Sequence, residues 1–133
     1  MGCDIHIVLE FRERNSVEWV GAWLSDRLLQ TPRIAMRDYA FFAEVAAVRG
    51  HTPTSIFPRN LPKDVSRLAW LAYMRCPTDY HSPSHATPEE FVGAWRRANP
   101  NYKDWREEFA EWDLLRIDID HECDWRVVYW FDN

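Results

Sequence analysis

The 133-residue sequence is poor in several features that define common functional classes. Only four glycines occur, which leaves little room for a Gly-rich phosphate-binding loop, and no G-x-S-x-G nucleophile elbow is present. No apolar run reaches the ~20 residues that a membrane-spanning helix needs. The first residues lack the basic segment of a secretory signal. The three cysteines form no C-x-x-C pair, which is typical of a protein kept in a reducing cytosol.

Positive charge is also in deficit, with 16 Lys and Arg against 21 Asp and Glu and a formal net charge of −5. An extended nucleic-acid interface needs a positive surface, so we expect none, whereas a few arginines can still hold a small phosphate-bearing ligand. Aromatic residues are abundant, with eight Trp, seven Phe and five Tyr. The length is that of one domain, and we expect residues 1–133 to form a single compact unit.

Alternating apolar residues predict strands at both ends of the chain. Residues 3–12 place Cys3, Ile5, Ile7 and Leu9 on one face, and residues 17–24 predict the second strand of a hairpin, with Gly21 at a bulge. Residues 114–120 and 125–131 alternate in the same way. Between these ends, three- and four-residue apolar spacing predicts helices over 37–48, 63–74, 88–98 and 101–112, separated by Pro-rich loops over 51–62 and 76–88. This order favours an α+β fold, in which an antiparallel sheet carries three to four helices on one side.

Asp4 and His6 form the first candidate site. Period two puts both on the polar face of the first strand, roughly 6.6 Å apart at Cα, where they could share a metal ion or act as a base and its orienting group. The loop Asp79–His85 adds His81 and His85 as further ligands or acid/base groups. The alternative is that these polar side chains simply fill a solvent-exposed strand face and a solvated loop.

Arginines and acidic residues form two further candidate sets. Arg33, Arg37, Arg49 and Arg59 gather around the first predicted helix, near Tyr39, and could bind phosphate by forked hydrogen bonds and stacking. Surface salt bridges are the alternative. Asp118, Asp120 and His121 could join a site at the sheet, or could be charges on an edge strand that discourage aggregation.

Several blocks of the chain resemble a group of small uncharacterised proteins encoded by bacteriophages and prophages. The blocks are Met1-Gly2-Cys3-Asp4-Ile5-His6, Arg37–Phe42 with Val48-Arg49-Gly50, Arg59–Ser66, Asp79-Tyr80-His81-Ser82 and Tyr129–Asn133. The chain departs from the group's pattern at Asp38 and Asn60 and after His81. The resemblance implies a phage origin and a location in the host cytoplasm, and it favours the polar residues of these blocks as one site.

The main hypothesis is therefore a phage-encoded hydrolase or phosphoesterase that acts on a nucleotide-like substrate. Asp4, His6 and His81 would hold a divalent metal or do the acid/base work, while Arg37, Tyr39, Arg49 and Arg59 would bind the substrate. The alternative is a non-enzymatic accessory protein that binds a host defence component or sequesters its signalling nucleotide. The sequence leaves the metal, the substrate and the oligomeric state open.

Overall fold

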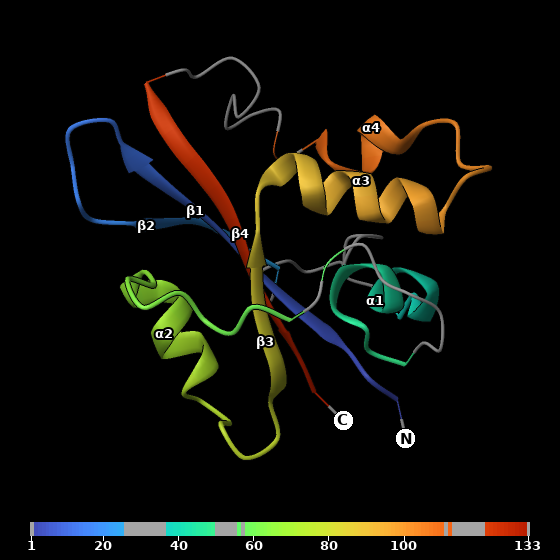
Figure 1. The fold of residues 1–133 in the computed structure, drawn as a ribbon, viewed down its shortest axis with the longest axis horizontal. Coiled ribbons are helices and arrows are strands. Elements are labelled where there is room, and N and C mark those ends of the chain that lie inside the picture. Colours follow the sequence, from blue (N-terminus) through green and yellow to red (C-terminus); the bar gives the residue numbers. More distant parts are fainter. Residues whose placement is uncertain are drawn as a thin grey trace.

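The computed structural model of the protein describes residues 2–25, 37–49, 56, 58–110, 112 and 122–132. These residues form β1 (Ile5–Glu13), β2 (Val20–Leu24), α1 (Tyr39–Ala46), α2 (Arg67–Tyr73), β3 (His81–Ala86), α3 (Pro88–Ala98), α4 (Trp105–Glu108) and β4 (Cys123–Phe131). The four strands make one antiparallel sheet in the order β2-β1-β4-β3 (Figure 1). The α+β fold with strands from both chain ends is thus confirmed.

The centre of the sheet is the long pairing of β1 with β4, which runs from Ile5 opposite Phe131 to Glu13 opposite Cys123. The predicted hairpin of β1 and β2 is also present. Its register shifts so that Leu9 pairs with Trp23 while Glu10 pairs with Gly21, which leaves one extra residue in β2. The irregularity therefore falls at the glycine where a bulge was predicted.

Helices cover both faces of the sheet, and the prediction that they pack on one side is wrong. One face carries Ile5, Ile7 and Leu9 in the main core cluster, together with aromatic side chains of α1 and α3. The other face carries Val8, Val128 and Trp130, which pack with Ala69 and Ala72 of α2. Figure 1 shows α2 on the opposite side of the sheet from α1 and α3. This second layer covers the face of β1 that was predicted to be polar, and Val8 and Glu10 on that face are both fully buried.

The helices begin where side chains can cap them. The Asp38 carboxylate accepts a hydrogen bond from Phe41 N at the start of α1, and the Ser66 hydroxyl accepts one from Ala69 N at the start of α2. The helix α2 therefore begins at Arg67 and not at residue 63, where the sequence predicts a helix to start. A capping box of Thr87 and Glu90 opens α3, at the predicted start of the 88–98 helix. Within the predicted 101–112 helix, α4 covers Trp105–Glu108, and Ala110 and Trp112 are also helical.

The edge strand β3 was not predicted, because residues 76–88 were expected to form a loop. A proline at position 83 suits an edge strand, where its missing N–H breaks no inner ladder, and the pairing with β4 is irregular between His81 and Ser84. The predicted strand over 114–120 lies outside the described residues. No disulfide bond joins Cys3, Cys76 or Cys123 in the structure. Within the described part of the chain, no helix is long and apolar enough to cross a membrane.

Candidate active site

The candidate site lies where the two ends of the chain meet. Because β1 and β4 pair along their whole length, His6 stands opposite Trp130, and the residue after β4, Asp132, lies beside Asp4. The backbone continues the ladder there, since Asp132 N donates to Asp4 O at 3.0 Å. Asp4 N in turn donates to the Asp132 carboxylate at 3.1 Å. In Figure 1 both termini emerge at this same end of the sheet.

His6 and Asp132 form a close histidine–carboxylate pair. His6 Nε2 lies 2.7 Å from Asp132 Oδ2, and the two side chains are 14% and 24% exposed. The imidazole stacks on Trp130, with the ring planes 10° apart, and Tyr80 lies against it at a centroid distance of 4.9 Å. These rings and the Asp132 carboxylate fix the position of the imidazole, an arrangement in which an imidazole can act as a general base.

Asp4 holds Arg37 by two hydrogen bonds. Arg37 Nε donates to Asp4 Oδ1 at 2.6 Å and Arg37 Nη2 donates to Asp4 Oδ2 at 3.1 Å. This contact lowers the pKa of the Asp4 carboxyl. It also leaves Arg37 Nη1 outside the forked contact, and the Arg37 side chain is 55% exposed. A guanidinium that is oriented in this way can offer its remaining donors to an anion.

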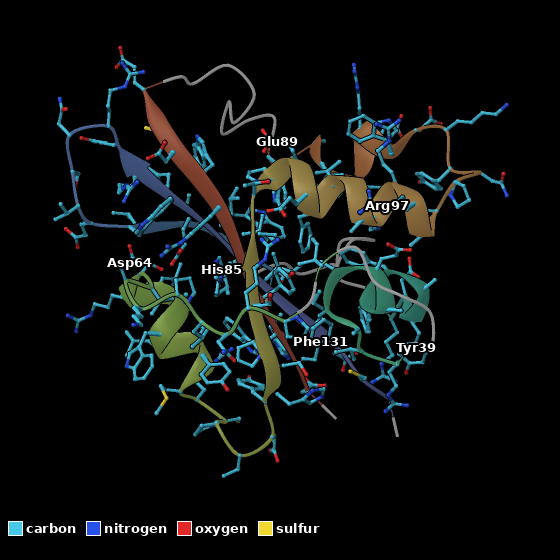
Figure 2. The ribbon with its side chains drawn as sticks, in the orientation of Figure 1. Tyr39, Asp64, His85, Glu89, Arg97 and Phe131 are labelled. Atoms are coloured by element: carbon cyan, nitrogen blue, oxygen red, sulfur yellow. The ribbon has the colours of Figure 1, made fainter. Side chains whose placement is uncertain are left out.

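Tyr39 and Arg49 complete the surroundings of the N-terminal segment. Cys3 N donates to the Tyr39 hydroxyl at 3.3 Å, and the Arg49 guanidinium lies 5.4 Å from the centre of the Tyr39 ring. Figure 2 shows Tyr39 on α1, near the end of the molecule where the termini lie. Burial raises the pKa of the Cys3 thiol, with Arg49 opposing the shift, so Cys3 is a buried thiol and a poor nucleophile, as its place on the apolar face predicted.

An open cleft of about 500 Å³ gives access to this cluster. The cleft is lined by Gly2, Asp4, Arg37, Cys76, Asp79, Tyr80 and Asp132. Asp132 and Tyr80 form its wall, and His6 is in contact with both of them. The cleft therefore exposes the Arg37 guanidinium and the Asp132 carboxylate, and His6 lies behind Asp132 and Tyr80.

His81 does not join Asp4 and His6, and the predicted metal triad is not assembled. His81 pairs with Phe131, whereas His6 pairs with the preceding residue of β4, and successive strand residues point to opposite faces. The His81 ring stacks on Phe131 at 6.1 Å, and its Nδ1 lies 3.0 Å from the Ser82 hydroxyl. In the described part of the chain, no three His, Cys, Asp or Glu residues come together in a way that could hold a metal ion.

Arg59 is the second predicted site residue that lies elsewhere. Its guanidinium binds both carboxylate oxygens of Glu90 at 2.9 and 2.6 Å and donates to His85 O at 3.3 Å. The Glu90 pKa is lowered to about 2, chiefly by this hydrogen-bonded arginine. Arg59 thus anchors its loop to the start of α3, and His85 Nδ1 lies 3.1 Å from Asn60 O in the same region. Arg33, Asp118, Asp120 and His121 lie outside the described residues.

Sequence reasoning missed Asp132 and Tyr80 as functional residues. Both stand in blocks that carry the phage resemblance, which was the one available signal. No local pattern could pair Asp132 with His6, because 126 positions separate them and only the β1–β4 register brings them together.

Comparisons with known proteins do not add to this geometry. No protein-family model, curated protein or solved structure matches the chain.

Proposed function

We propose that the protein is a phosphoesterase whose cleft binds a nucleotide-like phosphodiester and hydrolyses it. The observation that carries the proposal is the 2.7 Å contact of His6 with Asp132, next to a guanidinium that Asp4 holds at the same cleft. A proton acceptor and an anion-binding group are the two elements that hydrolysis of a phosphate ester needs from a protein.

The charges around the cleft favour a diester over a monoester. Asp4, Asp79 and Asp132 line the cleft with Arg37, and Arg49 lies nearby against Tyr39. Three carboxylates against two guanidinium groups disfavour a phosphate with two negative charges, because each added charge meets the same repulsion. A phosphodiester carries a single charge, and Tyr80 on the cleft wall offers a ring for contact with a base.

In the proposed reaction, the His6–Asp132 pair takes a proton from water as the water oxygen bonds to phosphorus. The ester oxygen leaves with its bonding electrons and receives the proton from the pair. The imidazole holds the proton between these steps, paired with the Asp132 carboxylate. Arg37 and Arg49 stabilise the charge that develops on the phosphate oxygens.

The test is the release of nitrophenolate from bis(p-nitrophenyl) phosphate and from p-nitrophenyl phosphate. We expect turnover of the diester in preference to the monoester, and a loss of about 10²–10⁴-fold in His6→Gln and Asp132→Asn, the usual range for a general acid–base group. His85→Gln is the matched control, since His85 lies at the Arg59 loop and should leave the rate unchanged. Failure of the wild-type protein to cleave any diester, or full activity in His6→Gln, would contradict the proposal.

A binding role without hydrolysis is the alternative, in which the protein sequesters a signalling nucleotide or engages a host defence protein. The same cleft supports nucleotide capture through Arg37 and Tyr80. Calorimetry with a dinucleotide separates the two roles. Tight binding that weakens in Arg37→Gln, together with an absence of turnover, would favour sequestration over catalysis.

A further inference from the structure

The three carboxylates of the cleft differ in whether they are already engaged. The Asp4 carboxylate holds Arg37 by two hydrogen bonds. The Asp132 carboxylate lies 2.7 Å from His6 Nε2. The Asp79 side chain is exposed at the same cleft and forms no hydrogen bond or ion pair with another described residue. Among these three, Asp79 therefore has the carboxylate whose acceptor atoms are open to a ligand.

The backbone fixes the position of Asp79. Asp79 N and Tyr80 N both donate to Cys76 O at 3.1 Å, which closes a turn between α2 and β3. Figure 1 shows this connection at the end of the molecule where both termini emerge. Asp79 and Tyr80 are neighbours in the chain, so their Cα atoms are about 3.8 Å apart. The turn therefore presents a carboxylate directly beside the aromatic wall of the cleft.

The aromatic wall is held in place by other rings. The Tyr80 ring has three neighbours, with centroids 4.9, 5.9 and 5.9 Å away in His6, Tyr73 and Trp130. A ring that is already fixed can receive a nucleobase without being ordered first, and stacking on an aromatic side chain is a common way to bind a base. A base that packs on Tyr80 brings its edge within reach of the neighbouring Asp79 carboxylate.

An unpaired carboxylate disfavours an anionic ligand unless the ligand brings hydrogen-bond donors to it. Among the four bases of RNA, guanine alone carries two adjacent donors on its Watson–Crick edge, N1–H and N2–H. The two oxygens of a carboxylate can accept from both at once, as they do from arginine. Adenine and cytosine present an acceptor nitrogen beside the amino group, and uracil presents one N–H between two carbonyls. A carboxylate at the edge of the base therefore favours guanine.

We propose that Asp79 makes the cleft selective for a guanine nucleotide, with the base against Tyr80 and its Watson–Crick edge on the Asp79 carboxylate. The inference rests on the proposed function, because the same cleft holds the phosphodiester at Arg37. Arg37 and Asp79 both line this space of about 500 Å³, so they contact the phosphate and the base of one ligand at the same time. Arg37 then serves any phosphodiester, and Asp79 selects among the bases.

The test is calorimetry with the dinucleoside monophosphates GpG, IpI and ApA, each of which carries two identical bases. The His6→Gln protein, in which the proposed hydrolysis is slow, keeps Arg37 and Asp79 and therefore reports binding alone. We expect GpG to bind at least about tenfold more tightly than ApA, the usual discrimination by a two-bond contact to a base. IpI should fall between them, because hypoxanthine keeps N1–H and lacks the amino group.

Asp79→Asn in the same background gives the sharpest result, because an amide matches adenine. Its oxygen can accept from the adenine amino group while its NH2 donates to N1, whereas against guanine the NH2 meets another donor. The variant should therefore bind ApA more tightly than GpG and reverse the order seen with Asp79. Asp104→Asn, at the start of α4, makes the same chemical change outside the cleft lining and should keep the preference for GpG.

Equal binding of GpG and ApA, or a preference for GpG that Asp79→Asn leaves unchanged, would overturn the guanine contact. An equal loss of both ligands in Asp79→Asn would also overturn it, because the carboxylate would then act on the sugar. Cleavage of bis(p-nitrophenyl) phosphate by a wild-type protein without base preference would leave the hydrolysis standing and overturn only this contact. A guanine preference that depends on Asp79, without cleavage of any diester, would support the contact and overturn the hydrolysis.

Discussion

Two polar clusters share one face of β1 and differ in what covers them. At the start of the strand, Asp4 and His6 lie beside an open cleft, with side chains 43% and 14% exposed. Further along, Glu10 is fully buried beneath the segment that leads into α2. There it accepts hydrogen bonds from Ser66 N, at 2.6 Å, and from Arg126 Nε.

The covered cluster is a structural joint. Arg126 also donates to the Asp64 carboxylate at 2.8 Å and stacks over Trp19 at 4.0 Å. One arginine therefore connects β4 to the segments that lead into β2 and α2. A buried carboxylate must keep every partner, because the loss of one leaves an uncompensated charge away from water. The open cluster has no such constraint, since water can replace a partner. The same strand face therefore carries a buried cluster that holds structural elements together and, further along, an open cluster whose contacts can change.

Removal of the arginine from the covered cluster should have the largest effect on stability. In Arg126→Met, the Glu10 carboxylate stays buried without its cation, and breaking a buried pair costs about 3–5 kcal/mol. We expect a loss of this size in the free energy of unfolding from urea denaturation. Asp4→Asn in the open cluster is the comparison and should change stability far less, because both partners of its pair are well exposed.

A double variant tests the cause of that loss. Glu10→Gln with Arg126→Met removes the unpaired charge and keeps a side-chain oxygen that can accept from Ser66 N. The double variant should therefore be more stable than Arg126→Met alone. If it is less stable, the arginine acts by packing on Trp19 and not by pairing with Glu10.

The apolar face of β1 should give the next largest effect. Ile7 is fully buried in the main core cluster, and Ile7→Ala should cost about 2–5 kcal/mol, through lost burial and the cavity that remains. Val17→Ala is a control, since Val17 is 91% exposed and its truncation should be close to neutral. Equal melting of Ile7→Ala and the wild-type protein would contradict the assigned faces of β1.

The sequence predicted the elements of the fold better than their arrangement. Period two predicted β1 and β4, and three- and four-residue apolar spacing predicted α3, because these signals lie within a few residues. Nothing in the alternation says what covers a strand face, so the sequence does not show that Glu10 is buried. The short, proline-containing β3 has almost no local signal, and only pairing with β4 makes it a strand.

The sequence predicted only part of the candidate site, again because local patterns do not show which residues meet in the fold. Asp4, His6, Arg37, Tyr39 and Arg49 do come together at the cleft end of the molecule. His81 and Arg59 do not join them, because strand register and the Glu90 contact decide where those side chains lie. Residue type and sequence spacing carry no information on contacts between the two ends of a chain.

The smallest expected effect on stability is that of Gly2→Ala, which disturbs the open cluster. A Cβ on Gly2 would lie 1.9 Å from Arg37 Nη1, so Gly2→Ala should push the guanidinium off Asp4. A guanidinium is the end of a flexible side chain, so stability at neutral pH should hardly change. The Asp4 pKa, which Arg37 keeps below its ordinary value of 3.8, should rise towards that value. Carboxyl titration by NMR measures this shift directly.

The sign of the pH dependence follows from the direction of that shift. A carboxyl with a lowered folded pKa stabilises the protein above its unfolded pKa, and this contribution is lost as pH falls through the folded pKa. Gly2→Ala should therefore lose less stability on acidification than the wild-type protein. Gly93→Ala is the matched control, because its Cβ would approach Arg97 Nη1 at 3.3 Å without reaching the cleft, and the Glu90 carboxyl should titrate at about 2 in both variants. An unchanged Asp4 titration in Gly2→Ala would mean that Arg37 keeps its contact despite the added methyl group, and that Gly2 does not determine how the guanidinium faces the cleft.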